Sequence, residues 1–198
     1  MNETLATIEQ RHSTRKFAAT PVTDDALKVV LNAANQAPSA HNQQSWRFIV
    51  LRGEKKNGLA TLISENSAKF PKASSVLLRM AARTIVSSPA VIAIANTGKL
   101  IDHGKELFQI EDTLSHDFFR TMEIQSSSAA VQNLLLAATA TGLATVWLGI
   151  MYLIKKEVLE YLGEPQGEFM AIVPIGYADK ESKGPAKRTL ETIVSFKE

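Results

Sequence analysis

The run from Pro89 to Ala95 is almost entirely apolar, and Asn96-Thr97-Gly98 follows it directly. A short apolar run that ends in turn residues is typical of a β-strand buried on both faces. Such a strand needs a sheet with both faces covered, so the run predicts a central strand between two layers of helices. A second run, Phe169–Tyr177, predicts another buried strand of the same kind.

The rest of the chain alternates between strand and helix patterns. The aromatic and β-branched run Trp46–Leu51 and the short apolar run Leu143–Leu148 predict two further strands. Thr23 is a suitable N-cap for a helix that starts at Asp24, and Pro38 disfavours helix at the residue before it. Helices and strands interleave without regular βαβ units, which favours an α+β, three-layer α-β-α sandwich made of one domain. The helices are expected within residues 3–10, 24–37, 54–66, 72–85, 100–122, 123–141 and 155–162, and residues 192–194 are expected to be extended.

The predicted helix 123–141 is unusually poor in charge. Its small and apolar residues leave almost no charged face, and Gly142 follows as a natural helix-stop residue. A helix without a charged face is expected to be buried all round, either in the core or against a second subunit. Its small residues would let a partner helix approach closely.

Composition limits the classes of function. The 22 Lys and Arg against 20 Asp and Glu give a net charge of +2, and the clustered basic footprint of a nucleic-acid-binding protein is missing. The chain has no cysteine, which excludes disulfides, thiolate catalysis and cysteine-based zinc sites. We find neither a secretory leader at Met1–Leu5 nor an apolar stretch of membrane-spanning length, so we expect a cytoplasmic protein without nucleic-acid or membrane partners.

The segment Arg11–Arg15 concentrates two guanidinium groups and two hydroxyls directly after the first predicted helix. Arginine binds phosphate oxygens through two parallel N–H donors, so this segment is a candidate phosphate site. Exposed charged turns are common, and taken alone these five residues are more often a solvated basic turn. The pair Lys187-Arg188 near the C-terminus could add positive charge to the same site or be ordinary surface.

The segment from Pro38 to Trp46 packs three side-chain amides, a histidine and two hydroxyls between a predicted helix and a predicted strand. Amides supply donors and acceptors, which suits a heterocycle edge that presents carbonyl oxygens beside a ring N–H, as the pyrimidine ring of a flavin does. The alternative is an ordinary polar loop whose Asn and Gln side chains satisfy its own backbone. Gly149, at the end of the following short strand, is a further position where backbone can approach a ligand closely.

Several other chemistries lack their motif. The sequence contains neither G-x-G-x-x-G nor G-x-x-x-x-G-K-[ST], so a dedicated dinucleotide fold and a P-loop have no support. It also lacks the G-x-S-x-G elbow of a serine hydrolase. His103 and His116 lie near several carboxylates, but without H-E-x-x-H spacing we interpret them as part of a solvated helix face. No metal is therefore expected.

The candidate segments follow one another in a characteristic order. The motifs are R-H-S-x-R-x-F at 11–17, A-P-S-A-H-N-Q-Q-S-W-R-F-I-V at 37–50, the helix core at 129–138, W-L-G at 147–149, I-G-Y at 175–177 and the basic pair at 187–188. Together they span nearly the whole chain apart from residues 52–88 and 96–120. This pattern resembles that of the nitroreductase family of FMN enzymes. Ordered matches along one chain outweigh the separate alternatives for each segment.

The resemblance implies that this chain binds FMN. The residues that would hold its phosphate and ribityl end are Arg11, Ser13 and Arg15, with Arg188 reaching the same phosphate from the tail, Lys187 as a weaker candidate and His12 contributing mainly backbone contacts. The residues that would cover the isoalloxazine ring come from the partner subunit and are Pro38, Ser39, Ala40 and Asn42, with Gln44 supporting the loop. Leu148 and Gly149 would present backbone near the reactive ring nitrogen.

The implied fold is an α+β sandwich with a mixed central sheet, assembled as an intertwined homodimer. The helix 123–141 would pack at the dimer interface, and the C-terminal strand would cross onto the other subunit. Phe118 and Phe119 are candidate lid residues over the substrate channel, with core packing expected for at least one of them. Ser45 stands where relatives commonly have proline, and Ala144 where they often have glycine, so the resemblance does not fix the rigidity of the loop or the backbone path near the flavin.

The implied chemistry is a ping-pong reaction in a single pocket. NADH or NADPH would reduce the bound FMN and leave, and an electron-poor acceptor such as a nitroaromatic or a quinone would take its place. One pocket used in turn explains the missing dinucleotide motif, and we expect no catalytic acid–base side chain because the cofactor carries the chemistry. The alternatives are a flavin-binding redox sensor without significant turnover, or a dehalogenase, ring oxidase or flavin-consuming enzyme of the same fold.

Overall fold

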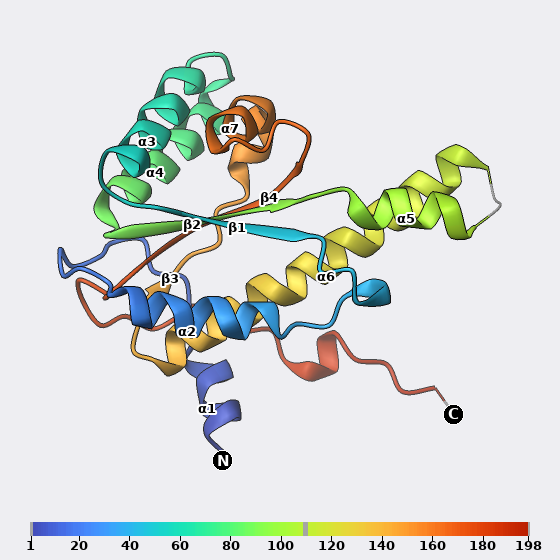
Figure 1. Ribbon diagram of the computed structural model, residues 1–198. Coiled ribbons are helices and arrows are strands. Elements are labelled where there is room, and N and C mark those ends of the chain that lie inside the picture. The colour runs from blue at the N-terminus through green and yellow to red at the C-terminus, as the bar shows by residue number, and fades with distance from the viewer. Residues whose placement is uncertain (1, 109–110, 198) are drawn as a thin grey trace.

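The structure, a computed structural model, describes residues 2–108 and 111–197. These residues form a central antiparallel sheet of four strands in the order β1-β2-β4-β3 (Figure 1). The strands are β1 (Trp46–Leu51), β2 (Ala90–Asn96), β3 (Ala144–Thr145) and β4 (Glu168–Gly176). Both predicted buried strands are therefore present, and every residue of β2 is buried, as its apolar run indicates.

Helices cover both faces of this sheet (Figure 1). On one face lie α3 (Gly53–Ser67), α4 (Lys72–Ser87) and α7 (Lys155–Leu162), and on the other lie α2 (Asp24–Asn35) and α6 (Asp112–Ala140). Strand β2 supplies both cores by alternation, since Val91, Ala93 and Ala95 pack with α3 and α4 whereas Ala90, Ile92 and Ile94 pack with α2 and α6. The predicted three-layer α-β-α sandwich is confirmed.

The parallel component of the expected mixed sheet is small. All three ladders between the strands of the described residues are antiparallel. Parallel pairing within this part of the chain is limited to one isolated bridge between Ser13 and Thr145. That bridge attaches the segment after α1 (Glu3–Gln10) to the outer edge of β3.

The ends of several helices follow from the sequence. Thr23 caps α2 as predicted, because its Oγ1 accepts the N–H of Ala26 at 3.2 Å. Helix α7 ends at Gly163, whose φ of 78° is a left-handed conformation that glycine adopts without a steric penalty. Local signals therefore position these helices without help from the rest of the fold.

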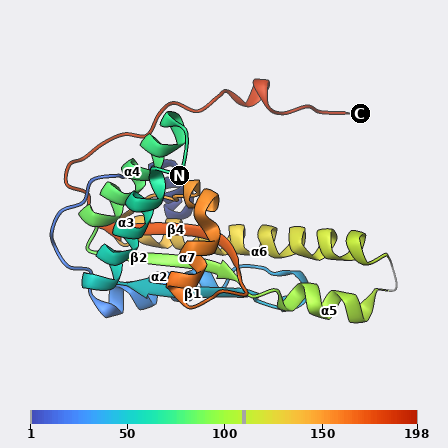
Figure 2. The ribbon, with the colours of Figure 1, turned by 90° about the horizontal axis from the view of Figure 1, so that it is seen from above.

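Helix α5 (Lys99–Leu107) and the first part of α6 form a hairpin that extends beyond the end of the sheet (Figures 1 and 2). We call α5 together with residues 112–121 of α6 the arm. The two helices pack closely because Gly104 has no side chain, and a Cβ atom there would overlap the ring of Phe119. The arm therefore has a small apolar core of its own.

Helix α6 is longer than the predicted helix 123–141 and begins at Asp112. Glu111 caps this earlier start, since its carboxylate oxygens accept the N–H groups of Thr113 and Leu114, both at 2.9 Å. The charged first half and the apolar second half of α6 are one helix, although their sequence patterns differ. Neither α6 nor any other helix of the described residues is both long and apolar enough to cross a membrane.

Two predicted extended segments differ from the structure. The strand expected over 143–148 is reduced to the two residues of β3, because the chain then leaves β4 and returns to it through an isolated bridge between Leu148 and Ile172. The prediction of an extended segment at 192–194 is wrong, since Leu190–Thr192 form a 3-10 turn. Figure 2 shows this tail running away from the body of its own chain, so it has no strand there to pair with.

Candidate functional site

The segment predicted to bind phosphate lies along the edge of β3. The N–H of Thr14 donates to the carbonyl of Thr145 at 2.9 Å, which fixes the segment beside the strand. Thr14 is buried, whereas its neighbours Ser13 and Arg15 are exposed. This alternation, typical of extended chain, places the hydroxyl of Ser13 and the guanidinium of Arg15 on the outer side of one strand-like segment.

The two arginines of this segment have no carboxylate partner. Among the described residues, neither Arg11 nor Arg15 takes part in an ion pair. Two guanidinium groups held in one short segment attract an anion, and their planar donor pairs match phosphate or carboxylate oxygens. Lys187 and Arg188 are also exposed, on the tail, and form no ion pair within the described part of the chain.

The side chain of His12 contacts the tail. Its Nδ1 lies 2.9 Å from the carbonyl oxygen of Gln10, and because a carbonyl can only accept, Nδ1 carries the proton. In the neutral ring Nε2 then accepts from the hydroxyl of Ser182, also at 2.9 Å. Gly184 passes so close that a Cβ atom there would lie 2.9 Å from the Cβ of His12. The ring of His12 therefore fixes the start of the tail.

The loop predicted to cover a flavin ring has an unusual backbone. His41, Asn42 and Gln44 have φ values of 52°, 52° and 48°, a left-handed conformation that costs non-glycine residues free energy. Internal hydrogen bonds hold this conformation, since the Gln44 amide nitrogen Nε2 donates to Asn42 Oδ1 at 2.9 Å and the Gln44 backbone donates to Ser39 Oγ at 3.1 Å. We call residues 38–44 the ring loop. Its shape is therefore supported by hydrogen bonds within the loop itself.

The ring loop is fastened to α6 and leaves a hollow beside it. The N–H of Ala40 donates to Ser126 Oγ at 3.1 Å, and Ser126 in turn donates to the carbonyl of Met122. A cavity of about 220 Å³ lies between the loop and the helix. Its lining residues are Pro38, Ser39 and Ala40 from the loop and Met122, Gln125, Ser126 and Ala129 from α6.

The two residues predicted to present backbone to a flavin differ in what they can offer. Both backbone groups of Leu148 are taken by Ile172, at 2.9 Å for its N–H and 3.2 Å for its carbonyl. The carbonyl of Gly149 accepts from Tyr152 at 3.0 Å, but no backbone hydrogen bond within the described residues uses the N–H of Gly149. The donor available at this place is therefore the Gly149 amide.

One chain brings together only part of the predicted site. Thr145, to which the phosphate segment is bound, follows the C-terminal end of α6, whereas the ring loop is bound to α6 at Ser126. At 1.5 Å per residue, roughly 21 Å of helix separate Ser126 from Ala140. Figure 1 likewise places the ring loop beyond one end of α2 and the phosphate segment toward the other. The phosphate segment is bound at Thr145, four residues before Gly149, whereas the ring loop is bound elsewhere on α6.

The two lid candidates have different environments. Phe119 is 1 % exposed and lies in the arm's core, in edge-to-face contact with Phe108 at 5.2 Å between ring centroids. Phe118 is 45 % exposed. Phe119 is therefore a core residue of the arm, as expected for at least one of the pair, and Phe118 is the one that can contact another molecule.

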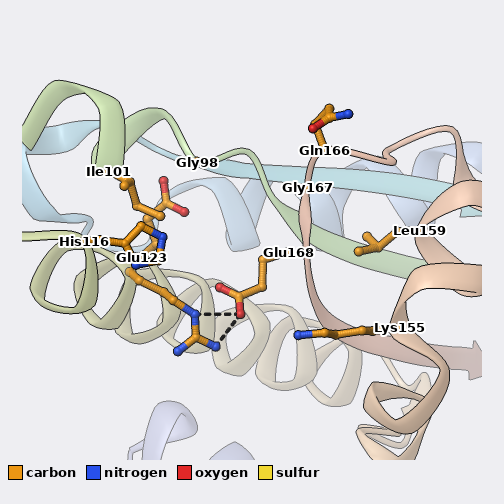
Figure 3. A pocket seen from close by; sticks show the side chains of 10 residues that line it. Gly98, Ile101, His116, Glu123, Lys155, Leu159, Gln166, Gly167 and Glu168 are labelled. Carbon is orange, nitrogen blue, oxygen red and sulfur yellow. Dashed lines mark hydrogen bonds and ion pairs between the residues drawn. The ribbon is translucent and has the colours of Figure 1, made fainter. Parts of the chain in front are cut away.

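A second cavity, of about 230 Å³, opens where the arm joins the body (Figure 3). An ion pair between Arg120 and Glu168 lies at its centre, with Arg120 Nε 2.9 Å from Glu168 Oε1, and this pairing raises the pKa of Arg120. Burial raises the pKa of the nearby Glu123, while the hydrogen bond from the Leu100 backbone and the nearby Ser45 side chain act in the opposite direction. No residue of the predicted flavin site lines this cavity, and the described residues contain no cluster that could hold a metal.

Comparison with known proteins identifies the fold and the motifs. The model of the Nitroreductase family matches residues 8–177, from just before the phosphate segment to the end of β4. The chain belongs to the nitroreductase family. The predicted recognition from ordered motifs is thereby confirmed, and the match also covers the variable arm that carries none of those motifs.

Relatives within the nitroreductase family are distant. An Archaeoglobus fulgidus protein with the provisional name NADH dehydrogenase/NAD(P)H nitroreductase is 28% identical over 184 residues, 91% of this chain and 88% of its own. A crystal structure of a Desulfitobacterium hafniense nitroreductase with bound FMN is 22% identical, with a TM-score of 0.76 over 100% of both chains. The NADPH:FMN oxidoreductase of Vibrio harveyi, complexed with NAD+, gives 22% identity and a TM-score of 0.78 over 100% of this chain and 78% of its own.

Sequence reasoning missed the residues that support the candidate site from α6. Ser126 anchors the ring loop, and Met122 and Gln125 line the cavity beside it, but their types alone are ordinary for a helix. Glu123 did carry a signal. It is the lone charged residue between 121 and 154, and a lone charge in an apolar stretch indicates a buried, partnered group.

Proposed function

We propose that this protein is an FMN-dependent oxidoreductase that takes electrons from NADH or NADPH and passes them to nitroaromatic, quinone or similar electron-poor acceptors. The observation that carries the proposal is the juxtaposition of two unpaired arginines, Arg11 and Arg15, with the strand edge that leads to the amide of Gly149. An anionic group at one end of a ligand and a hydrogen-bond acceptor at its other end fit these two places. The names of its FMN-binding relatives support the same cofactor.

The side chains present suit the parts of FMN. The guanidinium groups and the Ser13 hydroxyl supply donors for the phosphate. The side-chain amide of Asn42 keeps its Nδ2 donors for the ring edge, because Gln44 contacts only the backbone carbonyl and Oδ1 of Asn42. Bound FMN supplies the electron-transfer chemistry. The protein's residues bind and orient it, exclude water, and direct the Gly149 N–H and positive charge toward it.

We propose further that the active form is a homodimer in which each site combines two chains. The outer edge of α6 carries neutral side chains that are half-buried or exposed in the single chain. The residues of this edge are Gln125, Ser128, Ala129, Gln132, Leu136 and Ala140. Two such helices packed antiparallel about a twofold axis would bring Ser126 of one chain near Ala140 of the other. The ring loop of one subunit would then meet the phosphate segment of its partner.

A ping-pong order fits a site of this kind. The chain has no dinucleotide-binding motif, so the nicotinamide donor and the acceptor would use the same face of the flavin in turn. The cavity beside the ring loop and the exposed ring of Phe118 are the parts of the site that would meet either molecule. Initial rates measured against both substrates would give parallel double-reciprocal lines, whereas intersecting lines would contradict this order.

The cofactor proposal is tested by identifying the chromophore released from purified protein and by adding each nicotinamide anaerobically. We expect FMN, bleached by NADH or NADPH and reoxidised by a quinone or nitroaromatic. Hydrogen bonds to charged groups contribute roughly 1.5–3 kcal/mol, so Arg15→Ala should weaken FMN binding about tenfold or more. Arg83→Ala, an exposed change on α4 across the sheet, is the matched control.

Two results would redirect the proposal. A yellow protein that neither nicotinamide bleaches would favour a flavin-binding redox sensor. A colourless protein that does not bind added FMN would contradict the cofactor assignment altogether. Bleaching without turnover of nitroaromatics or quinones would leave the flavin site in place and move the activity to another reaction of the same fold.

A further inference from the structure

Glu123 is a buried carboxylate at the junction of three elements. It is 1 % exposed and lies on α6 where the arm meets the body of the protein. Its Oε1 accepts the N–H of Leu100 in the first turn of α5 at 2.9 Å. The N-cap position of α5 is Gly98, which has no side chain to supply this acceptor. A carboxylate from α6 therefore takes the place of the missing cap.

The second oxygen of Glu123 points to a different element. Glu123 Oε2 and the hydroxyl of Ser45 are both buried, and in this structure neither makes a hydrogen bond of acceptable geometry. Ser45 and Glu123 lie near each other, because the carbonyl of Ser45 accepts the N–H of Thr97, three residues before the Leu100 that Glu123 binds. The Ser45 side chain accordingly lowers the pKa of Glu123, against the larger raising effect of burial. A hydroxyl donor and a carboxylate acceptor are complementary, so each of these two buried groups can satisfy the other.

Ser45 ties this carboxylate to the ring loop. It directly follows Gln44, the last residue of the loop, and its carbonyl accepts the N–H of Thr97 at 3.0 Å. Asn96 completes the junction, since its side-chain amide is hydrogen-bonded to the hydroxyl of Ser127 on the next turn of α6, and this hydroxyl also contacts the carbonyl of Glu123. The end of the ring loop, the end of β2 and the base of the arm therefore converge on one turn of α6.

We propose that Glu123 is a positioning residue that joins the arm to the ring loop, holding α5 through the N–H of Leu100 and the loop through the hydroxyl of Ser45. No other carboxylate of the described residues bonds to the first turn of α5. The link fixes the angle between Phe118 on the arm and the ring loop. Its consequence for catalysis rests on the proposed function, in which these two parts contact the acceptor and the flavin.

The location of Glu123 separates its effect from that of cofactor binding. The phosphate segment is attached at Thr145, beyond the far end of α6, and shares no hydrogen bond with the junction. Loosening the junction should therefore change how an acceptor fits while leaving the grip on the phosphate in place. A purely structural role would instead lower stability, FMN affinity and the turnover rate together.

The test compares three substitutions in the full-length, FMN-loaded protein. Glu123→Ala removes both acceptor oxygens. Glu123→Gln keeps one oxygen for Leu100 and offers an amide N–H that the Ser45 hydroxyl can accept. Ser45→Ala breaks only the loop side and removes a single atom, so it keeps the question answerable if Glu123→Ala folds poorly. Glu111→Ala is the matched control, because it removes a carboxylate cap at the arm's tip without touching the ring loop.

Hydrogen exchange and acceptor kinetics are the two readouts. We expect Glu123→Ala to speed amide exchange tenfold or more in both α5 and the ring loop, and to raise the acceptor KM at least fivefold. FMN affinity should fall by a clearly smaller factor, because the phosphate segment still binds. Glu123→Gln should restore both values to within twofold of the parent. Combining Ser45→Ala with Glu123→Ala should add nothing to the ring-loop effect of Glu123→Ala alone. Glu111→Ala should affect the first turn of α6 only.

Three results would overturn the inference. Faster exchange confined to α5 would make Glu123 a helix cap and nothing more. Equal losses in stability, FMN affinity and turnover would make it a general core residue. Additive effects of the Ser45 and Glu123 substitutions on ring-loop exchange would show that the two side chains act independently. Failure of the proposed function is distinguishable, because a parent protein without FMN still reports coupling between α5 and the ring loop by exchange.

Discussion

The residues around the phosphate segment differ in what they do, and His12 is the clearest case. Its position between Arg11 and Ser13 suggests a ligand contact, but its ring bonds Gln10 and Ser182 and packs against Gly184. Gly184 and Arg188 are four residues apart, so at most about 14 Å of extended chain separates them. The contact with His12 therefore limits how far Arg188 can lie from the phosphate segment.

A double-mutant cycle in FMN affinity tests this role of His12. Arg188→Ala should weaken FMN binding several-fold, and His12→Ala should do so by a smaller factor because it only frees the tail. If His12 acts through Arg188, the double variant should bind FMN no more weakly than Arg188→Ala alone. Titration of apoprotein with FMN measures all four constants. Additive losses would instead assign His12 a direct contact with the cofactor.

The pH dependence of stability follows from Glu123. Burial raises the pKa of this carboxyl in the folded protein above its value in the unfolded chain, so the folded state binds the proton more tightly. The stabilisation that this tighter proton binding gives is fully present at pH values below the pKa of Glu123 in the unfolded chain. It is lost as the pH rises through the pKa of Glu123 in the folded protein. Glu123→Gln stays neutral, so its free energy of unfolding should gain on that of the parent as pH rises.

Urea unfolding at a series of pH values from about 4 to 8 measures this difference. Glu168 is the other carboxylate that acts on Glu123, and it is paired with Arg120. A gap between Glu123→Gln and the parent that is constant with pH, or that narrows as pH rises, would contradict the raised pKa.

At the scale of single elements, the ring loop combines strain with rigidity. His41 is held at a φ of 52°, a conformation that costs a β-carbon-bearing residue of order 1 kcal/mol. His41→Gly should therefore stabilise the protein by up to about 1 kcal/mol while weakening FMN binding, because a more flexible loop is less preorganised.

Asn42→Ala separates the two contributions of the loop. It removes the amide, including the Oδ1 that accepts from Gln44, and places an alanine at a φ of 52°, so FMN affinity should fall together with stability. Urea unfolding and FMN titration of the two variants give the comparison. A His41→Gly protein that is less stable than the parent would show that the loop stores no strain.

The elements also differ in how far their sequence specifies them. Strand β2 and the capped start of α2 are local features, since an unbroken apolar run and a threonine followed by aspartates have one simple interpretation. The start of α6 at Asp112 was missed because its first half is amphipathic and its second half charge-free, which looks like two helices. The turn at Leu190–Thr192 was missed because an apolar, β-branched group predicts a strand only where a partner strand is present.

At the scale of the whole molecule, the exposed neutral edge of α6 predicts an interface. Leu136→Glu places a charge in the middle of this edge, where burial against a second copy would leave it unpaired. It should dissociate the dimer and abolish FMN binding together. Met80→Glu, on the exposed side of α4 across the sheet, is the matched control and should change neither. Sedimentation measures the oligomeric state, and a monomeric parent that binds FMN would contradict the interface.

The site could be predicted from sequence only in pieces. Arginines after a helix and an amide-rich loop before a strand each suggested a ligand contact, because residue types carry that information locally. Their separation by about 21 Å of α6 within one chain is a property of the packed fold, and no spacing of residues 11–15 and 38–44 along the sequence reveals it. Ser126 acts through a tertiary contact and was missed for the same reason, whereas Glu123 was missed although its lone charge in a neutral stretch marked it.

The most direct test of a flavin shared between subunits is complementation between two inactive variants. Arg15→Ala lacks a phosphate contact and Asn42→Ala lacks a ring-loop contact, so each alone should bind FMN poorly. The two variants are unfolded, mixed in equal amounts and refolded together, so that half of the dimers contain one chain of each. If each site combines two chains, every mixed dimer carries one intact site of its two, and about a quarter of all sites should be restored. FMN bound by the mixture measures the recovery. No recovery in demonstrably mixed dimers would place both contacts in one chain and contradict the shared site.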